Sequence, residues 1–281
     1  MTGTIQVGFS MHPRWSDGIG LKQFLSPLRA AGLSVLEYEL DKNLDMWESF
    51  PRQMAEAQNL GMQLSFHAPY RSPYSLVGFN GEQRENIKDQ YREMLDIAST
   101  LATNDEDIKT VVIHAATAPK PAQAENLVAD TVLFLRWVCE TYPNLLLALE
   151  NNHPASEKQV KVGVERDGVL KIVSAVHHPH LRVCWDMGHD HLSGSSVMPE
   201  PEWLAEVAHV HVHDVNDSGA DHYPLVFGNV PYQPWLRALK QTGMKGTVVL
   251  ELKGNQLKVW PPDQIQSVLI DSIRTIIKEV Q

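Results

Sequence analysis

Residues 147–150 read Leu147-Ala148-Leu149-Glu150, three apolar side chains followed by a carboxylate. Five more apolar runs also end on a histidine, aspartate or glutamate: Leu64-Ser65-Phe66-His67, Val111-Val112-Ile113-His114, Val183-Cys184-Trp185-Asp186, Val207-Ala208-His209-Val210-His211 and Val248-Val249-Leu250-Glu251. Buried strands favour Val, Ile and Leu, whereas His, Asp and Glu are rarely left unpaired in a core. The six endings therefore indicate one polar, metal-binding mouth at which parallel strands converge.

Strand-like runs alternate with helix-compatible stretches along the whole chain. The expected strands are 5–9, 34–40, 62–67, 110–114, 145–150, 181–186, 207–213 and 247–252, and the clearest expected helices are 21–31, 45–60, 81–101, 122–141, 234–242 and 262–280. Gly32, Gly61 and Gly243 stand where helix C-caps are expected. Eight alternations predict an α/β fold, a single (β/α)8 TIM barrel. A Rossmann sheet is disfavoured because its G-x-G-x-x-G motif is missing after every strand.

The bulk composition is that of an ordinary soluble protein. At 281 residues the chain suits a single barrel domain spanning 1–281, with 43% hydrophobic and 21% charged residues. A net charge of −10 disfavours nucleic acid as a partner. The start of the chain lacks a signal-peptide pattern and no run has the length of a membrane span, so we expect a cytoplasmic protein without membrane contact. Cys139 and Cys184 are expected to be buried, reduced thiols.

The polar strand endings have the chemistry of a metal site. Catalytic groups of a TIM barrel sit at the carboxyl ends of its strands, so all six endings should face one site. Mixed carboxylate and imidazole ligands suit a divalent ion such as Mn²⁺, Co²⁺, Zn²⁺ or Mg²⁺, and the set contains no cysteine, which argues against a structural zinc. We therefore expect a divalent metal cofactor. The expected ligands are His67, His114, Glu150, Asp186, His211 and Glu251.

Motifs at these endings resemble those of the xylose isomerase-like TIM barrels, in the same order from the third strand to the eighth. They are His67-Ala68-Pro69-Tyr70, Glu150-Asn151-Asn152, Asp186-Met187-Gly188-His189, His211-Val212-His213-Asp214 and Glu251-Leu252-Lys253. That superfamily includes sugar isomerases and epimerases, and also the endonuclease IV branch of apurinic endonucleases. The resemblance implies a metal site of Glu150, Asp186, His211 and Glu251. It selects His211 because Asp214 follows three residues later, and it leaves His209 and His213 as hydrogen-bonding supports behind the site.

In the isomerase and epimerase members, a metal ion stabilises the enediolate formed when a carbon-bound proton leaves. The resemblance therefore implies a metal-dependent enzyme of carbohydrate metabolism. Its small-molecule substrate would be a sugar, polyol ketone or related hydroxy-carbonyl compound. Glu150 and Glu251 would be the catalytic base and acid. Because related barrels often pair, the resemblance also allows a homo-oligomer.

The endonuclease IV branch implies an alternative function, a multinuclear zinc phosphodiesterase that acts on abasic DNA. His67, His114 and His189 match its additional histidines, and together with His222 they are candidates for further metal or substrate binding. Asp221 and His222 are the nearest match to its Asp-x-His pair, but they are adjacent, and adjacent residues are expected to point apart. The negative net charge also weighs against DNA.

Substrate contacts should differ from those of the ketose epimerases, which place an arginine six residues after the metal histidine, where this chain has Asp217. Arg71 and Lys253 are candidates to bind an acidic substrate group such as a carboxylate or phosphate. Trp15 is a candidate to pack on the substrate as part of a lid.

Overall fold

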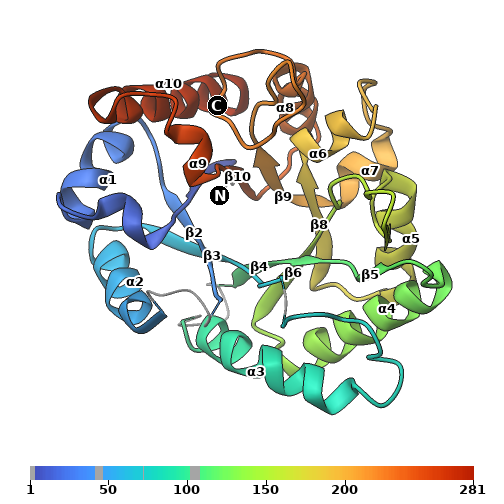
Figure 1. The fold of residues 1–281 in the computed structure, drawn as a ribbon. Helices are drawn as coiled ribbons and strands as arrows, with labels where there is room; N and C mark the ends of the chain where they lie inside the picture. Colours follow the sequence, from blue (N-terminus) through green and yellow to red (C-terminus); the bar gives the residue numbers. More distant parts are fainter. Residues whose placement is uncertain (1–3, 42–46, 72, 102–107) are drawn as a thin grey trace.

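Eight parallel strands close into a barrel inside a ring of helices (Figure 1). The computed structural model describes residues 4–41, 47–71, 73–101 and 108–281. The barrel strands follow the order β1-β10-β9-β8-β6-β4-β3-β2, each hydrogen-bonded to the next. They are β1 Gln6–Ser10, β2 Val35–Glu39, β3 Gln63–His67, β4 Lys109–His114, β6 Leu145–Glu150, β8 Leu181–Asp186, β9 Val207–Val212 and β10 Thr247–Leu250. The expected (β/α)8 barrel is confirmed.

The helices that surround the barrel each bury one apolar stripe. In α1 the buried residues Leu21, Phe24, Leu25 and Leu28 recur at the spacing of one helix face. The helices are α1 Leu21–Ala30, α2 Phe50–Asn59, α3 Arg84–Thr100, α4 Ala124–Thr141, α5 Arg166–Val176, α6 Met187–Leu192, α7 Pro201–Glu206, α8 Tyr232–Gln241, α9 Gly254–Leu257 and α10 Pro262–Val280. Short 3-10 helices span Pro13–Ser16 and Trp47–Ser49. Residues 45 and 46 of the expected helix 45–60 lie outside the described residues.

Gly32 shows why a helix of this barrel must end on glycine. Its φ of 107° is a left-handed conformation, and a Cβ atom there would lie 2.3 Å from Cδ1 of Ile277 in α10. Only glycine meets both conditions without strain. The predicted end of the first helix is therefore confirmed, and β2 begins three residues later.

The inside of the barrel is filled, which leaves the carboxyl ends of the strands for a site. Val112, Ala148 and Cys184 form a small buried cluster, and each lies two residues before the polar residue that ends its strand. Side chains two residues apart in a strand share a face. A Cβ atom at Gly8 would lie 3.0 Å from Cγ2 of Val249, so β1 also packs tightly here. The polar endings therefore form a layer on top of a packed interior.

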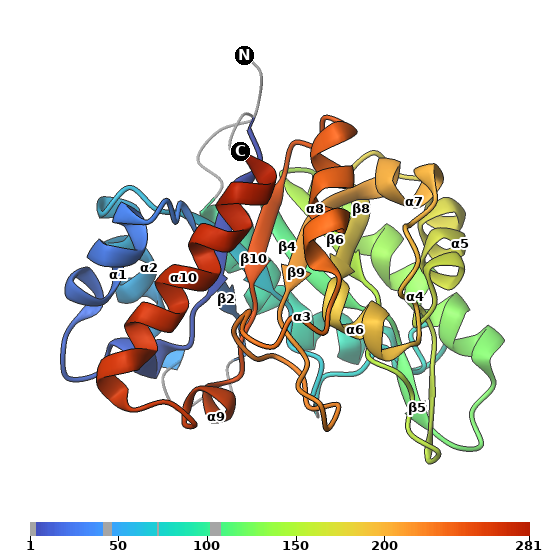
Figure 2. The same ribbon diagram turned by 90° about the horizontal axis from the view of Figure 1, so that it is seen from above.

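Two additions lie on the side of the barrel away from the C-terminus (Figure 2). They are α9 and the antiparallel pair of β5 Thr117–Pro119 with β7 Gln159–Lys161. Both cysteines are free and buried, as expected. None of the helices in the described ranges combines the length and apolar character needed to cross a membrane.

Candidate metal centre

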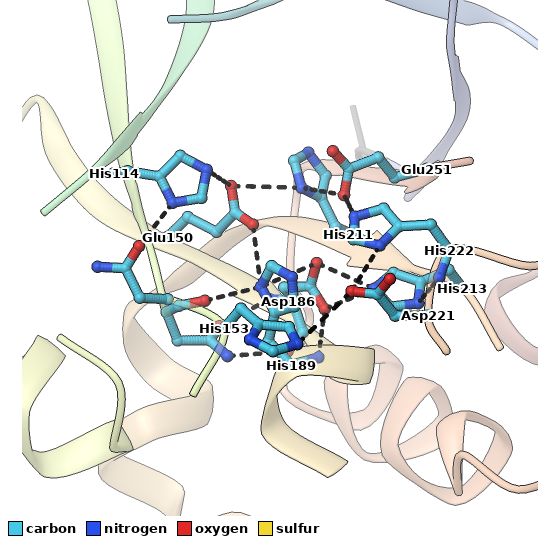
Figure 3. Close-up of polar contacts among 12 residues, drawn as sticks. His114, Glu150, His153, Asp186, His189, His211, His213, Asp221, His222 and Glu251 are labelled. Atoms are coloured by element: carbon cyan, nitrogen blue, oxygen red, sulfur yellow. Dashed lines mark hydrogen bonds and ion pairs between the residues drawn. The ribbon is translucent and has the colours of Figure 1, made fainter. Parts of the chain in front are cut away.

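Four residues from four strands converge at the carboxyl end of the barrel (Figure 3). Each of Glu150, Asp186, His211 and Glu251 offers a ligand atom, and these atoms lie within 4.8 Å of one another. Glu150 is the last residue of β6, and Asp186 is the last residue of β8. His211 lies in β9, and Glu251 directly follows β10. Glu251 is the most accessible of the four, with 18% of its side chain exposed. The structure thus brings together the four residues that the resemblance implies as the metal site.

Glu37 of β2 determines how His211 faces this site. Its Oε1 lies 2.8 Å from Nε2 of His211, and its Oε2 lies 2.8 Å from Nε2 of His209. Burial opposes ionisation of Glu37, but the two histidines hold its pKa below the usual range. Because a carboxylate only accepts, both imidazoles donate through Nε2. His211 therefore presents Nδ1 to the site, and His209 is held below it.

The atoms at the centre of this group fit a cation. Nδ1 of His211 lies 3.2 Å from Oε2 of Glu251 and 3.5 Å from Oε2 of Glu150. Nδ1 of His211 and Oε2 of Glu251 are both buried and have no hydrogen-bond partner among the described residues. Burial opposes a charge on His211, but the acidic groups around it raise its pKa well above the ordinary value. These atoms repel one another unless a proton or a metal ion lies between them.

A second group of donors shares Glu150. Nδ1 of His67 donates to the carbonyl of Ala68 at 2.9 Å, which leaves Nε2 to face Oε2 of Glu150 at 3.2 Å. His114 is held at Nδ1 by Oδ1 of Asn152 at 2.8 Å, and its Nε2 lies 3.3 Å from the same glutamate oxygen. The amide nitrogen of Asn152 donates to a backbone carbonyl at 2.8 Å, so its oxygen is the accepting atom. Two imidazole nitrogens and a carboxylate oxygen thus face one place beside the first group.

Asp186 is positioned by the helix that it begins and by His213. Its Oδ1 accepts the backbone N–H of His189 at 2.7 Å, the N-cap bond of α6. Nδ1 of His213 accepts the backbone N–H of His222 at 3.0 Å, so Nε2 carries the proton and lies 3.1 Å from Asp186. A Cβ atom at Gly188 would lie 1.9 Å from Cε1 of His213, so this position requires glycine. His213 therefore supports Asp186 by hydrogen bonding.

His189 and His222 present different charge states to the site. Nδ1 of His189 donates to the carbonyl of Asn151 at 3.1 Å, and burial lowers its pKa to about 4, so its ring is neutral. His222 lies between Oδ2 of Asp221 at 3.0 Å and Oε2 of Glu251 at 3.2 Å. Burial opposes its protonation, but these two carboxylates raise its pKa to about 9.

The expectation that Asp221 and His222 point apart is wrong. His222 has a left-handed φ of 58°, which turns its ring back beside the carboxylate of Asp221. Asp214, which is fully buried, organises the loop that carries both residues. Its carboxylate accepts the backbone N–H groups of Val215, Phe227, Gly228, Asn229 and Val230.

A cavity of about 520 Å³ opens above the metal-binding group. Arg71 and Lys253, the predicted contacts for an acidic group, line it together with His114, His189 and His222. Trp15 does not. Its ring packs 4.8 Å from that of Phe9 and lines a separate cavity of about 190 Å³ beside α9 and α10, so the structure does not place Trp15 against the proposed substrate.

Three contributors to the site were not predicted from the sequence: Glu37, Asn152 and Lys161. A glutamate in the middle of the apolar run 35–38 is the only signal that could have indicated Glu37. Asn152 lies in the motif Glu150-Asn151-Asn152, but the motif gave it no role, and nothing local distinguishes Lys161 from an ordinary strand position.

Comparison with known proteins agrees with this geometry. A family model for the xylose isomerase-like TIM barrel matches residues 25–276. The chain belongs to this family. An uncharacterized protein of Methanocaldococcus jannaschii, MJ1311, is 23% identical over an alignment of 252 residues, and the match covers 78% of this chain and 78% of MJ1311.

Solved members of the same fold cover almost the whole chain. D-allulose 3-epimerase from Methylomonas sp. in complex with D-allulose has a TM-score of 0.71 at 14% identity and covers 99% of this chain and 98% of its own. D-psicose 3-epimerase from Clostridium cellulolyticum H10 with D-tagatose has a TM-score of 0.71 at 16% identity, covering 98% and 97%. The 3-keto-D-glucoside 4-epimerase YcjR from E. coli has a TM-score of 0.67 at 14% identity, covering 98% and 99%. At these identities the likeness shows the shared fold.

Proposed function

We propose that this protein is a divalent-metal-dependent isomerase or epimerase that acts on a sugar, polyol ketone or related hydroxy-carbonyl compound. The observation that carries the proposal is the unpartnered Nδ1 of His211 facing Glu150 and Glu251 at the base of the cavity. Several structural neighbours are sugar epimerases, which supports the same class of reaction.

Glu150, Asp186, His211 and Glu251 would hold the ion. A divalent ion there would polarise the substrate carbonyl and the neighbouring hydroxyl, which makes the adjacent C–H more acidic. Asp186 would act only as a metal ligand and not in proton transfer, because its carboxylate is already held by the N-cap bond and by His213. Glu150 and Glu251 line the cavity and can also reach the substrate.

Glu150 and Glu251 would exchange the proton with carbon, one removing it and the other returning one to the same or the neighbouring carbon. Glu251 is the more exposed of the two, and Nε2 of His222 lies 3.2 Å from its Oε2. His222, which is protonated at neutral pH, can therefore donate a hydrogen bond to Glu251 and resupply the proton that Glu251 gives to carbon. Nε2 of His189, left as an acceptor by the hydrogen bond at Nδ1, is suited to orient a substrate hydroxyl.

A second candidate, the zinc phosphodiesterase, is favoured by one observation. Nε2 of His67 and Nε2 of His114 converge on Glu150, which could hold another ion beside the first. Two adjacent ions are a common arrangement for phosphoryl hydrolysis. The net charge of −10 opposes binding of a DNA polyanion, so we rank this function second.

Product analysis with metal-loaded protein tests the proposal. Protein loaded with Mn²⁺, Co²⁺, Zn²⁺ or Mg²⁺ is incubated with a panel of ketoses and keto-acids, and the products are separated by chromatography. We expect a new epimer or isomer from at least one compound, lost in Glu251→Gln and retained in the exposed control Glu125→Gln. Nicking of abasic duplex DNA, with no conversion across the panel, would select the second candidate instead.

A further inference from the structure

Three cationic side chains gather on the outer wall of the cavity in a protein whose net charge is −10. They are Arg71, which follows β3, Lys161 at the end of β7, and Lys253, two residues after Glu251. The floor of the same cavity is formed by the proposed metal ligands Glu150 and Glu251. Once an ion balances the charge of the floor, the wall is the positive part of the cavity.

Lys253 is only partly neutralised by its neighbours. Its Nζ lies 2.8 Å from Oδ1 of Asp221, whose other oxygen lies 3.0 Å from Nδ1 of His222. One carboxylate is therefore shared between a lysine and a histidine. Asp221 has no further charge to offer to a second lysine.

Lys161 is that second lysine. Its Nζ donates to the carbonyl of His153 at 3.1 Å, and no carboxylate pairs with it among the residues that the structure describes. The side chain is half-buried. Burial lowers its pKa, and the charge of Lys253, which lines the same cavity, lowers it further. An unpaired, half-buried cation beside a like charge is unfavourable unless an anion is bound.

The position of the two lysines relates them to the proposed substrate. The backbone N–H of Lys253 donates to the carbonyl of His222 at 3.3 Å, so Lys253 adjoins the metal-binding group directly. Lys161 comes from a different part of the chain, the β5–β7 pair. A cavity of about 520 Å³ lies within the usual range for small-molecule sites, about 300–1,000 Å³, and has room for a monosaccharide with a charged substituent.

We propose that the substrate carries an anionic group, a phosphate or a carboxylate, that Lys161 and Lys253 bind while the hydroxy-carbonyl end lies at the metal ligands. The proposal rests on the function proposed above for the chemistry at that end. Arg71, held 3.2 Å from the hydroxyl of Tyr70, lines the same cavity and can close over the anionic group. Charge-assisted hydrogen bonds from two or three cations would favour this substrate over its neutral analogue.

Calorimetry with unreactive polyols tests the proposal separately from catalysis. The Co²⁺-loaded protein is titrated with glucitol 6-phosphate, with gluconate and with glucitol, none of which has an aldehyde or ketone group to react. We expect at least one of the two anions to bind about ten-fold or more tightly than glucitol, and the preference to fall as salt is added. Preference for glucitol 6-phosphate would identify a phosphate, and preference for gluconate a carboxylate.

Variants of Lys161 and of the nearby Lys158 provide the controls. Lys161→Gln should reduce the preference to about three-fold or less, Lys161→Arg should restore most of it, and Lys158→Gln, an exposed lysine near the same strand, should leave it unchanged. Metal content, measured on each variant, shows that the site below is intact. Equal binding of the three polyols, or unchanged anion binding in Lys161→Gln, would overturn the proposal. Neither result would affect epimerisation of a neutral ketose, which tests the proposed function itself.

Discussion

The hydrogen-bond partner of each histidine decides which ring nitrogen can bind an ion. Glu37 fixes His211 through Nε2, the Ala68 carbonyl fixes His67 through Nδ1, and Asn152 fixes His114 through Nδ1. In each case the opposite nitrogen faces the carboxylates at the centre. Residues that never touch the ion therefore determine whether the ligands are ready for it.

Glu37→Gln tests this dependence. A Gln amide can accept from only one of His209 and His211 and places its NH₂ group against the other, so the orientation of His211 is lost. We expect divalent-ion affinity to fall about 10–100-fold, measured by titration calorimetry with Co²⁺. Glu125→Gln removes an exposed carboxylate of α4 and should leave the affinity unchanged. Equal affinities for the two variants would show that Glu37 has no positioning role.

Sequence reasoning reached the ligands more readily than their partners. The polar strand endings could be read from local patterns, but Glu37 lies 172 residues from His209, and only closure of the barrel brings them together. Because side chains alternate along a strand, His209, His211 and His213 lie on one face, and the alternation alone could not identify which of them binds the metal. The motif resemblance selected His211, and its metal-binding role stays a prediction.

Among the secondary-structure elements, the turn from β8 into α6 bears most directly on the site. Asp186 ends the strand, begins the helix and offers a ligand oxygen, while Gly188 leaves room for the ring of His213. The ring centroids of His213 and His222 lie 4.0 Å apart in a stacked arrangement, so a displacement of His213 would also displace His222. One short helix thus connects a proposed ligand to the loop that follows β9.

Gly188→Ala tests this packing. The added Cβ would lie 1.9 Å from Cε1 of His213 and force that ring away from Asp186. We expect a loss of about 1–3 kcal/mol in the free energy of unfolding, measured with urea on metal-free protein. Gly168→Ala in α5 meets nothing closer than 3.8 Å and should be neutral or slightly stabilising. If Gly188→Ala were as stable as Gly168→Ala, the space beside His213 would not be needed.

All eight barrel strands were predicted within two residues at each end, because each contains an apolar run and six of these runs end on a polar residue. The short elements were not predicted. Helices α6, α7 and α9 have six, six and four residues, too few for a helical period to be seen. The three-residue strands β5 and β7 depend on pairing with each other, so the position of Lys161 on the cavity wall could not be foreseen.

At the scale of the whole molecule, the buried histidines link stability to pH. In metal-free protein, burial opposes protonation of His67 and His222, but neighbouring carboxylates raise both pKa values to about 9. Their folded pKa values thus exceed the unfolded value of about 6.5. The stability that they contribute is complete below about pH 6.5 and is lost as the pH rises through 9.

We therefore expect the Tm of metal-free protein to fall between pH 6.5 and 8.5. A bound ion displaces these protons, so added Co²⁺ should raise the Tm more at pH 8.5 than at pH 6.5. Differential scanning calorimetry with and without the ion measures both effects, and the double variant His67→Gln, His222→Gln should flatten the metal-free profile. A metal-free Tm that rises over this range would contradict the assignment.

The barrel brings the proposed proton-transfer groups and the proposed metal ligands to one mouth. That residues 1–281 act as one domain stays a prediction. Incorporation of solvent deuterium tests the proposed function most directly. The Co²⁺-loaded protein is incubated in D₂O with a panel of neutral and acidic ketoses, and proton NMR follows the C–H next to the carbonyl. We predict that this signal is lost for at least one compound, that Glu150→Gln and Glu251→Gln prevent the loss, and that Glu125→Gln does not. A metal-loaded protein that exchanges no C–H across the panel would contradict the proposed function.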